Sequence, residues 1–287
     1  MQTPAFFKTI LGIALMAFNP SEDAQVPYIR FSKPQTGIQM VKINNAPDYV
    51  IEPVVASELM SAKELFEADK KMRVLVNAGF FDPNNGKTIS YVIKNKEIIE
   101  DPTLNESLMD NVQLQPHLDK ILNRGEFRVL VCENKVKKYD IAYHNDAVED
   151  SCDIKHSIQA GPILDERMDL EKEYFIEKNE NGEIVRDSIG TTKKLARTAI
   201  GIKGIDVYLF VVTDENPMTI EELSAFMKKK GMNKALAFDG GSSTSFENGA
   251  VSITSQGDNL GRKVKSFLTV RELEGYNPEI DMGNMFR

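Results

Sequence analysis

The stretch Ala235-Leu-Ala-Phe-Asp-Gly-Gly-Ser-Ser-Thr-Ser-Phe246 has four apolar residues in front of an acid and a glycine pair behind it. This pattern predicts a short buried strand that ends at Asp239. Glycine has no Cβ, so Gly240 and Gly241 allow a sharp turn and a close approach of the backbone to a ligand. The amides and hydroxyls of residues 240–244 would then hold an oxygen-rich or anionic group beside the carboxylate. A tight turn after a core strand explains the same spacing without a ligand.

The residues in front of this stretch predict two strands and a helix. Residues 197–202 and 206–214 are apolar runs that we expect to pair as central strands. Thr219-Ile-Glu-Glu222 is a capping box, and Gly231 stands where the helix would end. The chain would therefore run strand, strand, helix and strand into the Asp239 loop.

The rest of the chain predicts further strands and one more helix. Ser61-Ala-Lys-Glu64 is a second capping box, which predicts an amphipathic helix over 61–71. We expect one or two strands in 25–55, a strand at Val74–Val76, a hairpin over 88–100 with its turn at Asn95-Lys96, a strand pair at 127–132 and 136–143, a strand over 157–164 broken at Gly161-Pro162, and two strands in 249–272. Two surface excursions interrupt them, at 101–125, with one short helix near 114–122, and at 166–195. The predicted fold class is α+β, a single domain with a mixed β-sheet core and flanking helices.

The composition is that of an ordinary soluble globular protein. The 287 residues are 41% hydrophobic and 27% charged, with a net charge of −8. This charge argues against nucleic acid as a partner, because the only Lys/Arg cluster, Lys228–Lys230, lies at the predicted helix end. An anion-binding site in such a chain needs a local positive centre to overcome the negative field.

The metal-binding side chains do not form a recognisable site. Two cysteines and three scattered histidines lack zinc spacing. The acidic segment 146–153 lacks the ligand spacing and central glycine of a calcium loop, so a solvated acidic turn is the better interpretation. We therefore predict no metal and no cofactor. Cys132 and Cys152 form either a disulfide or two buried thiols, and the sequence favours neither.

The first residues resemble an export signal. Residues 9–18 are an apolar run of signal-peptide length, too short to span a bilayer. The acidic 22–24 end is a poor cleavage site, and cytoplasmic location stays the alternative. We expect a signal peptide in 1–24, an exported (secreted or periplasmic) protein without an integral membrane segment, and one domain over 25–287 with its core at 73–272.

Polar side chains stand where four predicted strands end: Asn77, Gln159, Arg197 with Thr198, and Asp239 with Ser242 and Ser243. A buried arginine is costly without an anionic partner or ligand. A salt bridge from Arg197 to Asp239 or Asp214 would satisfy this requirement equally well. Asn77 and Gln159 would serve as backbone caps in a purely structural interpretation.

Four motifs together resemble those of the phosphodiester glycosidase family, which includes N-acetylglucosamine-1-phosphodiester α-N-acetylglucosaminidases. They are Val76-Asn-Ala-Gly-Phe-Phe81, Gln159-Ala-Gly-Pro-Ile-Leu164, Arg197-Thr-Ala-Ile-Gly201 and Phe238-Asp-Gly-Gly-Ser-Ser-Thr244, in the family's order. The resemblance covers residues 73–272. Ala78, Ser90 and Ser242 stand where many members have glycine, which weakens any statement about the exact substrate.

The resemblance implies hydrolysis of a sugar-1-phosphodiester to a sugar and a phosphomonoester. Arg197 would bind the phosphate with two hydrogen bonds, and Asp239, or Asp214 as the second choice, would act at the anomeric carbon. The sequence does not decide between nucleophile and general base. The expected substrate-binding residues are Asn77, Gly79, Phe80, Phe81, Gln159, Gly161, Thr198, Gly240, Gly241, Ser242 and Ser243.

Two other functions use the same loops. One is a non-catalytic protein that binds a sugar phosphate or exopolysaccharide, which needs the arginine and the amides but no poised acid. The other is a different hydrolase of cell-envelope polysaccharides. We expect a small-molecule or polymeric sugar-phosphate substrate, while the oligomeric state stays open.

Overall fold

The computed structural model describes residues 29–255 and 261–273, so the expected signal peptide lies outside the described residues. The first of three five-stranded sheets has the order β1-β2-β13-β12-β14. Its strands are β1 (Ile29–Gln35), β2 (Ile38–Ile43), β13 (Asp206–Val212), β12 (Arg197–Lys203) and β14 (Lys234–Ala237). Six of the seven residues of β12 are buried, because the other two sheets pack on one face of this strand and the helix at Ile220–Lys229 packs on the other.

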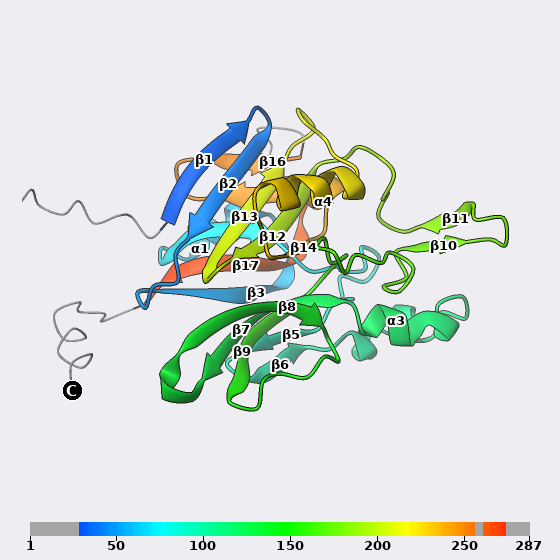
Figure 1. Cartoon of the computed structure of the whole chain (residues 1–287), viewed down its shortest axis with the longest axis horizontal. Coiled ribbons are helices and arrows are strands. Elements are labelled where there is room, and N and C mark those ends of the chain that lie inside the picture. The colour runs from blue at the N-terminus through cyan, green and yellow to red at the C-terminus, as the bar shows by residue number, and fades with distance from the viewer. Residues whose placement is uncertain (1–28, 256–260, 274–287) are drawn as a thin grey trace, which may run out of the picture.

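The other two sheets complete the body of the molecule. The second has the order β16-β15-β4-β17-β3 and the third β6-β5-β9-β7-β8. Their strands are β3 (Tyr49–Met60), β4 (Met72–Asn77), β15 (Ser245–Glu247), β16 (Ser252–Thr254), β17 (Val264–Glu272), β5 (Val92–Lys94), β6 (Glu97–Glu100), β7 (Gly125–Cys132), β8 (Lys137–Tyr143) and β9 (Cys152–Gln159). Figure 1 shows the three sheets one above the other, with β17 and β3 in the middle.

One hydrophobic core joins the three sheets. Buried Ile200 from the first sheet, Val76 from the second and Phe127 from the third belong to the same cluster. A core shared in this way makes one domain, which confirms the predicted single-domain α+β class. The expectation of a mixed sheet is wrong in one respect, since every strand pair in the described ranges is antiparallel.

The two predicted capping boxes begin the two helices that pack on the sheets. Ser61 caps α1 (Ala62–Ala68) and Thr219 caps α4 (Ile220–Lys229), each with the reciprocal glutamate contact. The apolar face of α4 packs on the outer face of the first sheet. Gly231 has φ +81°, a left-handed conformation that ends the helix. The first helix is shorter than predicted, because the chain leaves the helical conformation at Asp69.

The two excursions extend toward the same end of the molecule (Figure 1). The first contains α2 (Glu106–Met109) and α3 (Leu118–Leu122), so its helix is shorter than predicted and a second one precedes it. The second excursion contains the hairpin β10 (Ile176–Lys178) and β11 (Ile184–Asp187). The N-terminal region also forms three strands rather than the one or two expected.

A disulfide joins Cys132 on β7 to Cys152 on β9, so the two cysteines are not the pair of buried thiols that the sequence left as the other possibility.

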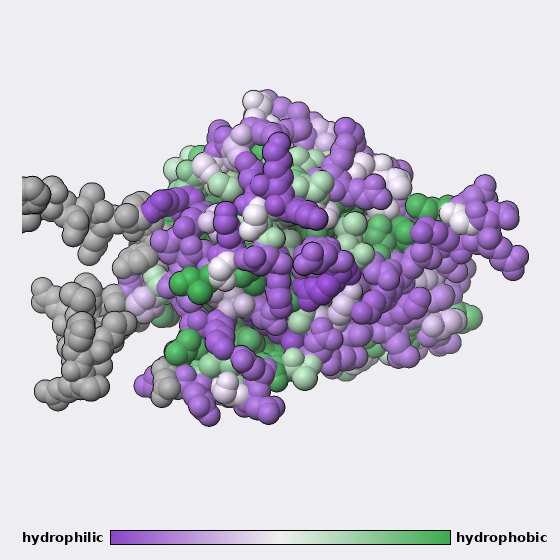
Figure 2. Space-filling view, in the orientation of Figure 1, coloured by the Kyte–Doolittle hydropathy of each residue, from purple (hydrophilic) through white to green (hydrophobic). Residues whose placement is uncertain are grey.

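The helices of the described ranges are too short or too polar to cross a membrane. Figure 2 shows a largely hydrophilic face, with apolar residues near the base of the β10–β11 hairpin.

Candidate active site

The Asp239 loop follows β14 as predicted, and backbone hydrogen bonds join it to the residue after β4 and to the start of β12. Asp239 N donates to Ala78 O at 2.8 Å, and Phe238 N donates to Thr198 O at 2.8 Å. Gly241 N donates to Ala196 O, also at 2.8 Å. Gly240 lies so close to the neighbouring strand that an added Cβ would be 3.1 Å from Ala196 O. The glycine pair therefore allows the loop to lie directly against β12.

The Asp239 carboxyl lies at the wall of a cleft of ≈ 390 Å³. It is partly exposed to the cleft and enclosed by protein on its other sides. This enclosure raises its pKa from 3.8 to about 6, while the Ser243 hydroxyl, the Arg262 charge and the Gly240 amide oppose the rise. A carboxyl that titrates near neutral pH is suited to general acid–base or nucleophilic chemistry.

Three arginines line the same cleft. Arg262 donates to the Ser242 hydroxyl at 3.2 Å, and its guanidinium carbon lies 5.3 Å from the centre of the Phe81 ring. Arg124 comes from the end of the first excursion and Arg186 from β11 in the second. The cleft thus carries three positive groups beside one carboxylate, in a chain of net charge −8. This local positive centre is what anion binding in an acidic protein requires.

The apolar part of the cleft comes from the loop after β4 and from the first excursion. Phe80 and Phe81 line it, together with Leu108, Leu114 and Ile121. Phe80 N donates to the Ser90 hydroxyl at 2.9 Å, which fixes the loop, and a Cβ on Gly79 would be 3.0 Å from the Ser90 side chain. Aromatic faces beside cations and a carboxylate are a suitable lining for a sugar ring and a phosphate.

Asn77 and Thr198, both predicted to bind substrate, hold the Asp239 loop from behind. Asn77 is 1% exposed and donates to Asp239 O at 2.5 Å. Its Oδ1 accepts from the Thr198 hydroxyl at 2.7 Å and from Ser245 N at 3.0 Å. With three of its hydrogen bonds made to protein, Asn77 links β4, β12 and β15 to the Asp239 backbone.

Gln159 and Gly161 also hold the chain together beside the cleft. Gln159 donates to Leu122 O at 2.7 Å and accepts from Tyr91 N at 3.3 Å, so it fixes the end of the first excursion. Gly161, which precedes a cis peptide bond to Pro162, donates to Ala237 O at 2.9 Å. Its φ is +130°, and a Cβ there would lie 2.8 Å from the Glu173 carboxylate. Only glycine fits this position without strain.

The Arg197 guanidinium turns away from the cleft. Its Nε donates to Met218 O at 3.0 Å, Nη1 to Ile189 O at 3.1 Å, and Nη2 to Gly190 O and Lys193 O. Four of its five N–H groups are thereby used by backbone carbonyls. Neither predicted salt bridge is among its contacts, and burial lowers its pKa to about 10. Arg197 organises residues 189–193, of which Ile189 lines the cleft.

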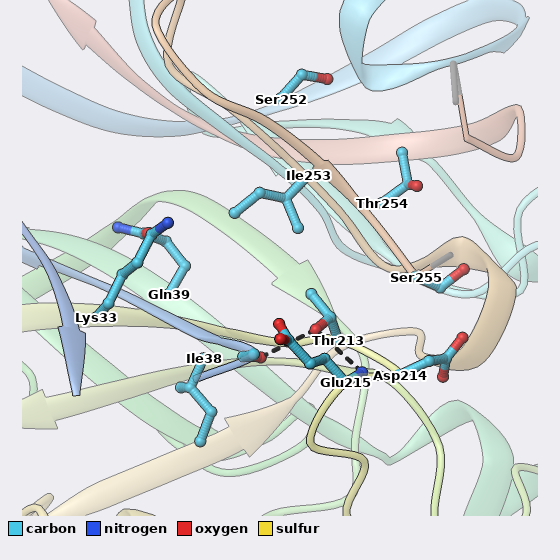
Figure 3. A pocket seen from close by; sticks show the side chains of 11 residues that line it. Lys33, Ile38, Gln39, Thr213, Asp214, Glu215, Ser252, Ile253, Thr254 and Ser255 are labelled. Carbon is cyan, nitrogen blue, oxygen red and sulfur yellow. Dashed lines mark hydrogen bonds between the residues drawn. The ribbon is translucent and has the colours of Figure 1, made fainter. Parts of the chain in front are cut away.

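Asp214 lies in a second cavity of ≈ 510 Å³, shown in Figure 3. Lys33 and Gln39 lie on one side of this cavity, and Asp214, Glu215 and Ser255 on the other (Figure 3). The two cavities share no lining residue. The Asp214 carboxylate accepts from Ala196 N at 3.2 Å, so it caps the start of β12. Asp214 and Asp239 therefore line different cavities, although both are linked to Ala196, whose carbonyl accepts from Gly241 N.

No group of three or more His, Cys, Asp or Glu side chains in the described ranges is arranged to hold a metal ion. Of the predicted substrate-binding residues, Phe80, Phe81, Gly240, Gly241 and Ser242 line the cleft with Asp239. Ser243 is buried beneath them against the carboxyl.

Comparisons with known proteins identify the family of the chain. The family model for phosphodiester glycosidases matches residues 70–271. The chain belongs to the phosphodiester glycosidase family. No curated protein matches the chain closely enough to add to this assignment.

Three solved structures share the fold of this phosphodiester glycosidase family member. The zebrafish N-acetylglucosamine-1-phosphodiester α-N-acetylglucosaminidase catalytic domain, auto-inhibited by its pro-peptide, is 13% identical with a TM-score of 0.59, over 87% of this chain and 85% of that one. A hypothetical protein from Synechocystis is 14% identical with a TM-score of 0.56, and the match covers 85% of this chain but 61% of that one. A putative exported protein from Burkholderia pseudomallei is 11% identical with a TM-score of 0.51, over 82% and 73%.

The three cleft arginines were not among the predicted site residues. Arg124 and Arg186 stand in polar excursions without a motif, and Arg262 follows the segment after β16. A weak signal was available in the composition, since an acidic chain needs a cluster of positive side chains to bind an anion. Sequence spacing does not show which arginines meet in space.

Proposed function

We propose that this family member hydrolyses sugar-1-phosphodiesters at the glycosidic bond and releases the sugar and a phosphomonoester. The observation that carries the proposal is the position of the Asp239 carboxyl, whose pKa is raised to about 6, in a cleft with three arginines. An acid alone would suit many hydrolases. An acid surrounded by guanidinium groups favours a substrate with negative charge close to the reacting bond.

The phosphate site of the proposal is the Asp239 loop together with Arg262. The Arg262 charge acts on the Asp239 carboxyl, so a phosphate beside Arg262 would lie next to the acid. The Ser242 hydroxyl lies in the lining of the same cleft and offers a further contact to a phosphate oxygen, whereas the Gly240 and Gly241 amides already bond to the Asp239 carboxyl and to Ala196 O. Arg197, which the sequence suggested for this task, becomes a positioning residue, because its guanidinium is committed to backbone carbonyls.

Asp239 acts at the anomeric carbon in this scheme. Cleavage of the bond between C1 and the phosphate oxygen builds positive character on the sugar ring, which a neighbouring carboxylate stabilises. Water supplies the hydroxyl that replaces the phosphate at C1, and its second proton leaves to solvent. A phosphomonoester is a good leaving group, so one carboxylate is enough and strong acid assistance is not needed. As a nucleophile Asp239 gives retention at C1, and as a base for water it gives inversion.

The direct test is to incubate the protein with the methyl phosphodiester of N-acetylglucosamine 1-phosphate. Proton and phosphorus NMR would follow free sugar and methyl phosphate, and the first anomer to appear identifies the stereochemistry. We expect stoichiometric release of both products. Tight binding of the diester without any release would support the binding-protein alternative instead. Release from a neutral methyl glycoside at the same rate would contradict recognition of the phosphate.

Export of the protein is part of the proposal. The Cys132–Cys152 disulfide supports it, because structural disulfides persist in oxidising compartments. One solved protein of similar fold is itself described as a putative exported protein. Fractionation of cells that express the untagged chain, with the disulfide state read by thiol labelling, would test this localisation.

A further inference from the structure

Arg124 and Arg186 form an unusual pair in the wall of the cleft. Both donate to the same backbone oxygen, Tyr174 O, Arg124 through Nη2 at 3.3 Å and Arg186 through Nη1 at 2.7 Å. Two positive charges are thus held side by side, and each raises the free energy of the charged form of the other. An arrangement of this kind costs free energy in the empty protein and is offset when an anion binds between the two groups.

Aromatic rings hold both guanidinium groups in place. The Arg124 guanidinium carbon lies 4.0 Å from the centre of the Phe175 ring and 5.6 Å from that of Phe80. The Arg186 carbon lies 4.2 Å from the centre of the Tyr174 ring. Because the rings already pack against both guanidinium groups, binding an anion requires little further loss of side-chain freedom.

Neither arginine has a carboxylate partner within ion-pair distance in the described ranges, where the arginine ion pairs involve Arg73, Arg128, Arg167 and Arg271. The Glu173 charge acts on Arg124 but makes no ion pair with it. Glu173 accepts from Gly125 N at 2.9 Å and Ile163 N at 3.0 Å, and burial keeps its pKa at about 7. Glu177, opposite Arg186 across the hairpin, accepts from the Tyr174 hydroxyl at 3.0 Å.

Both arginines line the cleft and retain N–H groups that make no hydrogen bond to the described protein. A guanidinium has five N–H groups. Arg124 uses two, for Glu173 O and Tyr174 O, and Arg186 uses one. Both residues line the cavity that also contains Asp239 and Arg262. Three arginines exceed the single negative charge of a simple phosphodiester, even when Asp239 is ionised.

We infer that Arg124 and Arg186 form a second anion subsite, which binds a phosphoryl group of the substrate other than the one beside Asp239. The inference rests on the proposed function and narrows its substrate class. The preferred sugar-1-phosphodiester carries at least two negative charges, through a second phosphate on the group that leaves with the first one.

A binding experiment that needs no turnover tests the subsite. The ligands are α,ω-alkane bisphosphonates with one, three and five carbons, each matched to the monophosphonate of the same length, and titration calorimetry measures the affinity. A charge-assisted hydrogen bond contributes roughly 1.5–3 kcal/mol, so we expect at least one bisphosphonate to bind about 10-fold or more tighter than its monophosphonate. The best chain length measures the separation of the two anion sites.

Arg186→Gln should remove this preference, and Arg186→Lys should keep part of it, since lysine retains the charge without the fork. Arg186 is suitable because it lies half-buried on the projecting hairpin, where a substitution leaves the core intact. The matched control is Arg30→Gln, which removes the same charge from exposed β1 at the other end of the molecule (Figure 1). Equal affinity of the native chain for each bisphosphonate and its monophosphonate would overturn the inference. An equal loss of the bisphosphonate preference in Arg186→Gln and Arg30→Gln would overturn it as well.

The kinetic form of the experiment separates this inference from the proposed function. Two substrates share N-acetylglucosamine 1-phosphate, one esterified to propanol and the other to 3-phosphopropanol. We expect a lower KM for the second, and about a 10-fold rise of that KM alone in Arg186→Gln. If neither diester is cleaved but the bisphosphonate preference depends on Arg186, the proposed function fails and the anion subsite stands. Equal KM values for the two diesters would count against the subsite while leaving the hydrolase intact.

Discussion

Replacing Asp239 by Asn should remove turnover and, at the same time, stabilise the folded protein in a pH-dependent way. The carboxyl has a folded-state pKa of about 6 against 3.8 when unfolded. The folded protein therefore binds this proton more tightly than the unfolded chain does. The resulting contribution to the free energy of unfolding is lost as the pH rises from about 4 through about 6. Below pH 4 both states bind the proton, so ionisation of Asp239 has no effect there.

The magnitude follows from the shift. A difference of about two pKa units corresponds to about 3 kcal/mol at pH 8, and the same linkage gives about 1 kcal/mol at pH 4.5. Asparagine cannot ionise, so Asp239→Asn avoids this cost. The expected gain in unfolding free energy is thus about 2 kcal/mol larger at pH 8 than at pH 4.5. Any hydrogen bonds that are lost with the carboxylate change the gain in unfolding free energy equally at pH 8 and pH 4.5. The difference between the two pH values is therefore unchanged.

Urea unfolding followed by far-ultraviolet circular dichroism measures this difference, which suits a chain without tryptophan. The control is Asp110→Asn, an exposed aspartate on the first excursion, which should show no such pH-dependent gain. Asp214→Asn, which retains an oxygen for Ala196 N, tests the second candidate acid. If Asp239→Asn raises the free energy of unfolding by the same amount at pH 8 and pH 4.5, the raised pKa of the enclosed carboxyl is refuted. Loss of turnover in Asp214→Asn but not in Asp239→Asn would reverse the catalytic assignment.

Four further outcomes are expected. The kcat/KM for a phosphodiester should rise with pH around a midpoint near 6, because Asp239 must be ionised; a flat profile from pH 5 to 8 would contradict this. Arg262→Gln should move that midpoint to higher pH and raise KM, since the positive charge favours the carboxylate; a downward shift would be inconsistent with it. Arg197→Gln should lower the free energy of unfolding by several kcal/mol, roughly 1 kcal/mol for each lost contact to a buried carbonyl, so an unchanged urea midpoint would argue against a structural role. Replacing Cys132 and Cys152 by serine should cost about 3 kcal/mol, from the 20-residue separation that the disulfide closes, with turnover per folded molecule retained.

The elements of the fold could largely be predicted because they depend on local patterns. Capping boxes mark the starts of both packed helices, and Asn95-Lys96 adopts the positive φ values of a tight hairpin turn. The strand directions could not be derived in the same way. Whether β3 pairs with β17, more than 200 residues later in the chain, depends on the shared core and leaves no mark in either segment.

The sequence analysis named the residues at the centre of the candidate cleft but not the arginines at its edge. Asp239 and its glycines follow from the strand-to-turn pattern. The orientation of Arg197 does not, because its acceptors are backbone carbonyls of residues 189–193 and Met218, which carry no side-chain signal. Arg124 and Arg186 meet only because the two excursions fold against one another at Tyr174. Such contacts are tertiary, and a single sequence does not contain their geometry.

The four motifs share a structural task that their chemistry alone did not suggest. Asn77, Gly161 and the carbonyl of Thr198 all bond to the backbone between Ala237 and Asp239. The motifs thus form one frame that holds a single carboxylate at a fixed position, which is how a reacting group is pre-organised. The groups that would recognise the substrate around it come mainly from the excursions outside the motifs. The excursions can therefore vary the substrate without moving the acid, so the specificity of this chain is to be sought in Arg124, Arg186 and their neighbours.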